Sequence, residues 1–153
     1  MAEFILCANS HSRSILAANL ERSPCTSSVR LRIEENAGSA SAGYNRAMDA
    51  SDEPILVFLH HDVYLPQGWD KLLQARIAEV EAIDSNWAVL GAFGVAPDFS
   101  AWGPVWSSSL GKIVGGVPLA PKPACSVDEL LIVIRRASGI RFDDALPGWH
   151  LYG

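Results

Sequence analysis

The 153-residue sequence lacks most of the features that mark a membrane or secreted protein. No apolar run approaches the roughly 20 residues of a membrane-spanning helix, and the first residues carry no basic region of the kind that begins a signal peptide. The cysteines are few, odd in number and never spaced as C-x-x-C: Cys7, Cys25 and Cys125. We therefore expect reduced, buried thiols in a cytoplasmic protein without a membrane span.

Positive charge is also scarce. Twelve Lys and Arg stand against 17 Asp and Glu, which gives a formal net charge of −5, and the basic residues are scattered apart from Arg135 and Arg136. A nucleic-acid-binding surface needs clustered cations, so we expect no nucleic-acid partner. The chain is 49% apolar and 19% charged and has no linker, repeat or low-complexity segment. This composition indicates a single globular domain over residues 1–153.

The sequence does contain a regular alternation of strand and helix patterns. Apolar or alternating runs predict strands at 4–8, 29–33, 55–59, 87–95 and 130–134. Helical spacing of apolar residues predicts helices at 12–22, 39–48 and 69–83. The run 55–59 shows no alternation, as expected of a central parallel strand that is covered on both faces. The order of elements predicts an α/β fold: an open, mostly parallel sheet with helices on both faces.

The strand at 55–59 runs directly into His60, His61 and Asp62. Ligands of open α/β sheets bind beyond the carboxyl ends of the strands, and alternate residues of an extended chain point to the same side. We therefore expect His60 and Asp62 to face one ligand, with His61 on the other side. An alternative is that Asp62 caps the loop while the histidines form hydrogen bonds at the strand end. H-x-D pairs also occur in helical metal phosphohydrolases, but this pair follows a strand.

The block NAGSASAGYNRAMDASDEPILVFLHHDVYLPQGWDKLL, residues 36–73, resembles the core of family 2 glycosyltransferases with the GT-A fold. The pieces that carry the resemblance are Asn36, Gly38, Ala42, Asn45, Ala50, the strand 55–59, Asp62, Pro66 and Trp69. The segment VDELLIVIRRASGIRFDDALPGWHLYG, residues 127–153, resembles the later acceptor-side block of that family. The nearest look-alikes are bacterial glycosyltransferase-like proteins with H-x-D in place of D-x-D. The resemblance implies a nucleotide-sugar-binding half at 1–95 and an acceptor-side half at 96–153.

By this resemblance, the protein binds a nucleotide diphosphate sugar and transfers the sugar to an acceptor of unknown identity. A divalent metal, Mn²⁺ or Mg²⁺, would neutralise the diphosphate leaving group, with Asp62, His60 and His150 as the implied ligands. Imidazole suits Mn²⁺ better than Mg²⁺ and ligates only when neutral, so metal affinity would fall below about pH 6.5. The implied nucleotide-sugar contacts are Asn9, Ser10, Glu35, Asn36, Asn45, His60 and His61.

Aromatic and acidic residues of the second half are candidates for the acceptor side. Trp102, Trp106 and Trp149 are expected to stack on a sugar face or to pack in the core. Asp128 and Asp143 are the candidate catalytic carboxylates.

An inverting transferase needs a carboxylate general base, and the resemblance places that residue just beyond Gly153. We therefore expect an incomplete acceptor-side half. The alternative function is a catalytically incomplete nucleotide-sugar-binding module or assembly subunit, and the sequence is compatible with a homo-oligomer. An unrelated nucleotide-binding α/β protein is disfavoured, because neither G-x-G-x-x-G nor G-x-x-x-x-G-K-[ST] occurs.

Overall fold

The computed structural model describes residues 2–8 and 12–151 of the chain. Five strands form the main sheet: β1 (Ala2–Ala8), β2 (Arg30–Glu35), β3 (Ile55–Leu59), β4 (Val89–Gly91) and β10 (Leu131–Arg135). The α-helices are α1 (Arg13–Arg22), α2 (Ala40–Ala50) and α3 (Trp69–Ile83), and 3-10 turns lie at η1 (Pro24–Ser28) and η2 (Arg136–Ser138). Within the described residues, no helix combines the length and apolarity needed to cross a bilayer.

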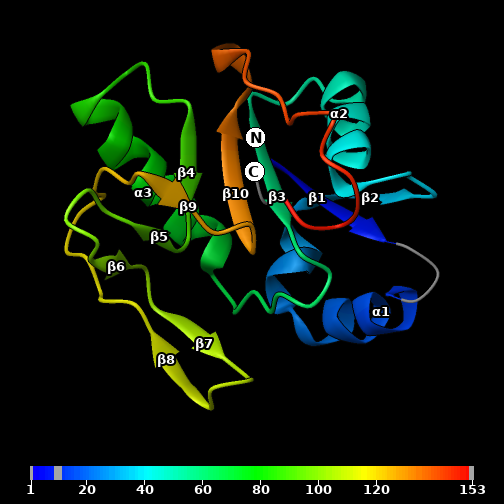
Figure 1. Ribbon diagram of the computed structural model, residues 1–153, viewed down its shortest axis with the longest axis horizontal. Coiled ribbons are helices and arrows are strands. Elements are labelled where there is room, and N and C mark those ends of the chain that lie inside the picture. The colour runs from blue at the N-terminus through cyan, green and yellow to red at the C-terminus, as the bar shows by residue number, and fades with distance from the viewer. Residues whose placement is uncertain (1, 9–11, 152–153) are drawn as a thin grey trace.

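The main sheet is mixed, with strand order β2-β1-β3-β10-β4 (Figure 1). β1 runs parallel to both β2 and β3, whereas β10 runs antiparallel to both β3 and β4. The predicted α/β class with helices on both faces is confirmed, but the prediction of a mostly parallel sheet is wrong, because β10 pairs antiparallel with both of its neighbours. Parallel pairing is confined to the three strands β2, β1 and β3, because β10 enters the sheet in the opposite direction.

The single strand predicted over 87–95 is wrong, since this region forms two strands in different sheets. β4 ends at Gly91, and β5 (Gly94–Val95) belongs to a second sheet with β6 (Ala101–Trp102) and β9 (Ser126–Val127). An added Cβ at Gly91 would lie 2.6 Å from the Cβ of Val127. A glycine inside a strand pattern often marks such a close approach, and here the chain leaves the main sheet immediately after it.

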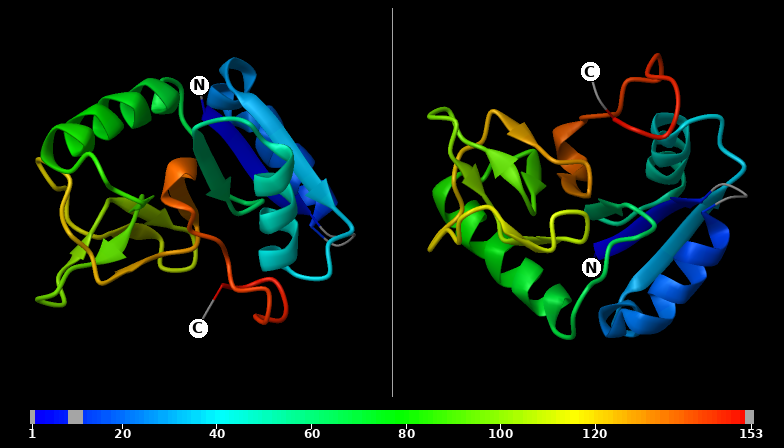
Figure 2. Two further views of the ribbon diagram at one scale, coloured as in Figure 1. Left: turned by 90° about the horizontal axis from the view of Figure 1, so that it is seen from above. Right: turned by 60° about the horizontal axis from the view of Figure 1, so that its bottom comes forward.

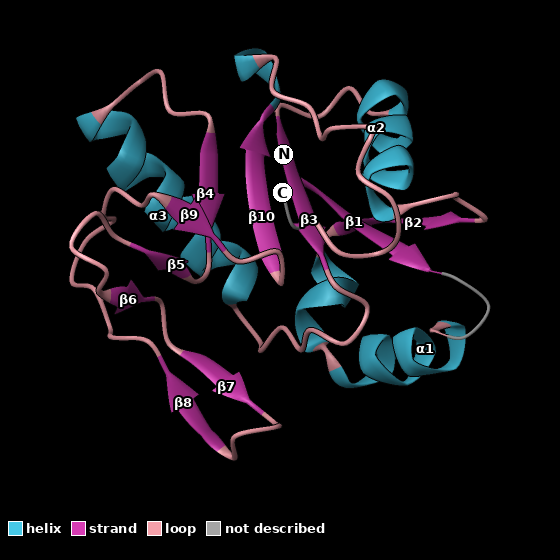
Figure 3. Cartoon of the chain, in the orientation of Figure 1, coloured by secondary structure: helices cyan, strands magenta, loops and turns pink. Residues whose placement is uncertain are grey.

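A third sheet consists of two strands only, β7 (Val105–Ser107) and β8 (Lys112–Val114). They pair antiparallel and project as a hairpin from the body of the molecule (Figures 1 and 3). After β4 the chain forms this hairpin and the second sheet, where a further β-α repeat would have formed a helix.

Helices lie on both faces of the main sheet (Figure 2), and an apolar cluster packs on each face. One face packs against α1, η1 and α3 and includes Phe4, Leu6, Val57, Leu59, Leu131 and Val133. The other face packs against α2 and the C-terminal segment and includes Ile5, Cys7, Leu56, Phe58, Ile132 and Ile134. Successive residues of a strand alternate between the faces, so burial on both sides explains the uninterrupted apolar runs of β1 from Phe4 to Ala8, of β3, and of β10 from Leu131 to Ile134.

A C-terminal segment, residues 139–151, is fastened across α2 by one buried side chain. The amide nitrogen of Asn45 donates to the carbonyl of Phe142 at 2.9 Å and to Oδ1 of Asp144 at 2.6 Å. The amide oxygen of Asn45 accepts the N–H of Phe142 at 3.1 Å. Asn45 is 4% exposed, so these bonds are shielded from water and hold the segment to the helix.

Replacing Asn45 by Ala is expected to lower the free energy of unfolding by about 1–3 kcal/mol, because it leaves buried backbone groups unpaired. Gln74→Ala, at an exposed position of α3, is the control and should stay within about 0.5 kcal/mol of the wild type. Urea unfolding followed by circular dichroism measures both. Equal stabilities of the two variants would show that Asn45 does not hold the segment.

Candidate metal-binding site

β3 ends in a turn that is fixed on two sides. The N–H of Val63 donates to the carbonyl of His60 at 3.2 Å, and the N–H of His60 donates to the carbonyl of Leu130 at 3.1 Å. The buried side chain of Asn19 on α1 donates to the carbonyls of His61 and Val63. The turn is thus bound by Asn19 of α1 and by Leu130, which directly precedes β10. The backbone of His60 therefore has a defined position at the edge of the sheet.

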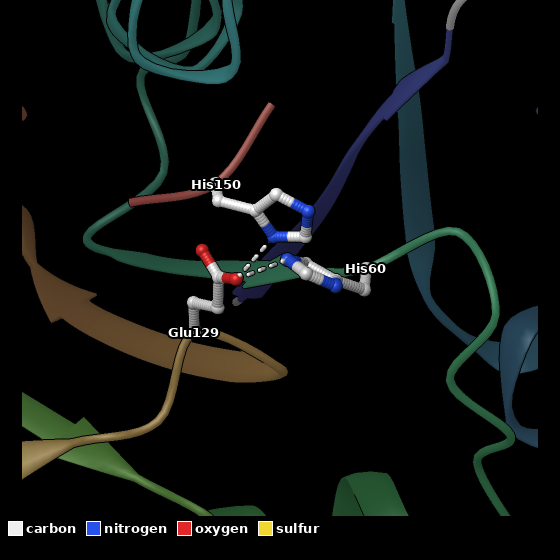
Figure 4. Close-up of side chains that lie close together, drawn as sticks. All are labelled: His60, Glu129 and His150. Atoms are coloured by element: carbon white, nitrogen blue, oxygen red, sulfur yellow. Dashed lines mark hydrogen bonds and ion pairs between the residues drawn. The ribbon is translucent and has the colours of Figure 1, made fainter. Parts of the chain in front are cut away.

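Three side chains from distant segments converge at this edge (Figure 4). Oε1 of Glu129 lies 2.8 Å from Nδ1 of His150 and 3.7 Å from Nε2 of His60. The second carboxylate oxygen of Glu129 accepts the N–H of Leu151. One ligand atom from each of His60, Glu129 and His150 lies within 4.8 Å of the others. We call these three residues the His–Glu–His cluster.

Each member of the cluster is placed by a different part of the fold. His60 follows β3, Glu129 precedes β10, and the register of these antiparallel strands pairs Leu131 with Leu59. His150 comes from the C-terminal segment that Asn45 anchors. The cluster therefore depends on tertiary structure and not on a local sequence motif.

The cluster borders a hollow of about 440 Å³. Its walls come from β5, β9, the start of β10 and the C-terminal segment, and its lining includes Phe93, Asp128, Glu129 and Leu151. A volume of this size is within the range of small-molecule sites. Polar residues such as Ser126 and Asp128 line the hollow together with apolar residues such as Phe93 and Ile132.

The donor set and spacing of the cluster fit a divalent metal. Two imidazoles and one carboxylate suit Mn²⁺, Fe²⁺ and Zn²⁺, whereas Mg²⁺ prefers oxygen ligands. Atoms that each lie about 2.0–2.2 Å from one ion are roughly 3–3.5 Å apart, close to the 2.8 and 3.7 Å seen here. The side chain of Glu129 is 12% exposed, and its carboxylate already accepts the N–H of Leu151 and forms a hydrogen bond of 2.8 Å with Nδ1 of His150.

Two other titratable groups on the α2 side of the sheet stay neutral. Burial raises the pKa of the Tyr44 hydroxyl far above its ordinary value, and Cys7 and Glu129 add to the rise. That hydroxyl donates to the carbonyl of Leu59 at 3.3 Å. Burial also raises the pKa of the Cys7 thiol to about 12, and the nearby charge of Glu34 adds to this. Neither group is a nucleophile or a base at neutral pH.

Asp62 and His61 lie in the turn and outside the His–Glu–His cluster. Asp62 is exposed and His61 is half-buried. The expectation that His60 and Asp62 face one ligand assumed an extended chain, and the turn ends that geometry at His60. The structure brings together His60 and His150, with Glu129 as the carboxylate beside them.

The remaining nucleotide-sugar candidates do not form one group in the described residues. Two of them fall outside the described residues: Asn9 and Ser10. Glu35 ends β2 and forms an ion pair of 2.6 Å with Arg13 of α1. Asn36 has φ 58°, a left-handed conformation that asparagine tolerates better than most residues. The side-chain amide of Asn45 is engaged by the C-terminal segment.

The three tryptophan candidates lie on separate elements. Trp102, on β6, donates to the hydroxyl of Ser100 at 2.6 Å, and the ammonium of Lys122 lies 4.0 Å from its ring centroid. Trp106, on β7, is 64% exposed. Trp149 packs against the apolar layer on the α2 side, which is a core role.

The two carboxylate candidates differ in their relation to the hollow. Asp128 lines it, and its Oδ1 accepts the N–H of Leu130 at 2.9 Å. Asp143 is exposed, and its Oδ1 accepts the N–H of Ala145 at 2.9 Å. Of the two, Asp128 is the one that a molecule in the hollow would meet.

Sequence reasoning missed Glu129, which contacts both histidines. The available signal was its position just before the apolar run at 130–134, next to the predicted candidate Asp128. This signal becomes informative only if the strand is antiparallel, because its amino end then meets the carboxyl end of β3.

The high thiol pKa of Cys7 has a measurable consequence. At pH 9 the exposed Cys125 should react with a disulfide reagent within seconds to minutes, because its thiol is open to solvent. Cys7 is 7% exposed and keeps its proton at that pH, so it should react only after unfolding. Mass spectrometry of the labelled peptides distinguishes the sites, and rapid labelling of Cys7 in the folded protein would contradict the burial argument.

A scan against protein-family models finds no match to this chain. No curated protein matches it either.

Proposed function

We propose that the chain is a GT-A-like domain that binds a nucleotide diphosphate sugar through a divalent metal held by His60, Glu129 and His150. The observation that carries this proposal is the convergence of the three side chains at the carboxyl end of β3, beside a hollow of about 440 Å³. Ligands of open α/β sheets bind at this edge. The resemblance of residues 36–73 to family 2 glycosyltransferases supports the choice of ligand.

The chemistry of a sugar nucleotide explains why a metal is needed in a protein of net charge −5. Cleavage of the anomeric bond leaves negative charge on the diphosphate, and a bound divalent ion neutralises it. Mn²⁺ is favoured over Mg²⁺ because two of the three ligands are imidazoles. Glu129 supplies the negative charge of the site, and its bond to the N–H of Leu151 fixes the orientation of the carboxylate.

The hollow beside the cluster is the proposed place for the transferred sugar. Two of the described acidic residues line the hollow, Asp128 and Glu129. Glu129 is the proposed metal ligand, which leaves Asp128 to contact a molecule in the hollow. We therefore assign Asp128 the role of contacting the sugar or the incoming acceptor hydroxyl. Transfer would break the bond between the anomeric carbon and the diphosphate oxygen, form a new bond to the acceptor oxygen, and pass the proton of the acceptor hydroxyl to a base, for which Asp128 is the candidate.

The experiment is a thermal-shift titration with Mn²⁺, Mg²⁺ and Zn²⁺, with and without UDP, GDP or dTDP. At a Mn²⁺ concentration of 100 times its Kd, the wild type should gain about 2.7 kcal/mol, which corresponds to roughly 5–10 °C in Tm. Glu129→Gln and His150→Gln should lose this gain, because each removes a metal ligand while keeping the shape of the side chain. Each variant is also measured without metal, which separates loss of the ion from loss of stability.

Asp62→Asn is the matched control and should keep the full Mn²⁺ response, since Asp62 lies outside the cluster. A response that disappears in Asp62→Asn and persists in Glu129→Gln would show that the metal is bound at the turn and that our ligand assignment is wrong. No response to any metal would leave the three side chains only the structural role of holding the C-terminal segment to β10.

A donor-hydrolysis assay then separates a transferase from a binding module. An enzyme releases free sugar from the matching sugar nucleotide in the presence of Mn²⁺, and Asp128→Asn should slow this release with little change in nucleotide affinity. Nucleotide binding without sugar release would instead support the function of a catalytically incomplete sugar-nucleotide-binding module.

A further inference from the structure

Residues 99–127, which we call the hairpin arm, include β6, the β7–β8 hairpin and β9. Twelve large apolar side chains of the described residues are strongly exposed, and half of them belong to this arm: Phe99, Trp106, Leu110, Ile113, Val117 and Leu119. Large exposed apolar patches mark interaction surfaces for proteins or membranes. The concentration in one projecting arm therefore needs a physical explanation.

The apolar side chains of the hairpin share one face and its tip. Trp106 and Ile113 are cross-strand partners, so their side chains lie next to each other on the same face. They are 64% and 63% exposed, and Leu110 in the connecting turn is 62% exposed. An isolated two-stranded hairpin is at best marginally stable in water. Burial of this face against a binding partner would therefore stabilise the hairpin.

The charge of the arm indicates the kind of surface that covers it. None of the 17 acidic residues lies between Asp98 and Asp128, whereas Lys112 and Lys122 both fall in that interval. Lys112 is on β8 and pairs with Ser107 next to the connecting turn, so its side chain lies near the tip of the hairpin on the face opposite Trp106 and Ile113. The arm is thus apolar and cationic in a protein whose other parts are acidic.

We propose that the hairpin arm docks on an anionic lipid surface, with Trp106, Leu110 and Ile113 entering the interface and Lys112 contacting the headgroups. Tryptophan is enriched at membrane–water interfaces, and anionic lipid attracts each nearby lysine. A symmetric contact between two copies through the same face is the alternative that the experiment must distinguish.

Sedimentation of the full chain with lipid vesicles tests the proposal, and this test does not require a bound metal or nucleotide. The protein should bind vesicles of phosphatidylcholine mixed with phosphatidylserine and bind phosphatidylcholine alone much more weakly. Trp106→Ser combined with Ile113→Ser should weaken partitioning by about tenfold or more, because two apolar anchors are lost. Lys112→Gln should weaken it about fivefold.

Two matched controls lie on α3, away from the arm. Ile83→Ser removes an apolar side chain that is 73% exposed, and Lys71→Gln removes an exposed lysine. Both should bind as the wild type does. Trp106→Phe should also keep binding while reducing the blue shift of tryptophan emission that the vesicles cause.

Absence of wild-type binding to anionic vesicles, or equal binding by the Trp106→Ser, Ile113→Ser double variant, would overturn the proposal. Sedimentation equilibrium is run on the same samples. Self-association that depends on Trp106 and Ile113, with no vesicle binding, would identify the arm as an interface between copies of this chain and would likewise overturn it. Thermal unfolding of each variant confirms that the fold is intact.

Discussion

The reversed direction of β10 is the constraint on which the rest of the site depends. Entering between β3 and β4, this strand pairs antiparallel with both. Its amino end therefore meets the carboxyl end of β3, and the pairing of Leu131 with Leu59 brings Glu129 beside His60. Glu129 then accepts the N–H of Leu151 and contacts His150. A parallel strand at the same place would present its carboxyl end there and would leave Glu129 at the opposite edge of the sheet.

The sequence predicted those parts of the fold that depend on local patterns of apolar residues. The apolar run at 4–8 predicted a strand, the run at 55–59 predicted a strand covered on both faces, and the helical spacing after Gly68 predicted α3. Pairing direction was not predictable in this way. Burial on both faces makes a strand apolar whichever way it runs, so the apolar run of β10 carried no information on its direction.

The candidate site was likewise predicted only in those parts that local sequence patterns determine. His60 was identified because it ends a predicted strand, and His150 was implied by resemblance to a family. Asp62 was paired with His60 on the assumption that the chain stays extended beyond Leu59. The turn that replaces this extended chain is stabilised by Asn19 of α1, and such a contact is not visible in the local sequence. Glu129 was missed because its neighbour His60 lies far from it in the chain and meets it only through β10. The site is formed by contacts between segments that are distant in the chain. A single sequence contains little information about such contacts.

The fastening of residues 139–151 across α2 also has a consequence for biosynthesis. As the chain leaves the ribosome, β1, β2 and β3 can pair early, but the side of the sheet that carries Ile5 and Phe58 still lacks the packing of Phe142 and Trp149. The nascent protein thus presents an incompletely covered apolar surface until residues 139–151 emerge, a state that is prone to aggregate and that chaperones recognise. The His–Glu–His cluster forms at the same moment, because His150 arrives with that segment.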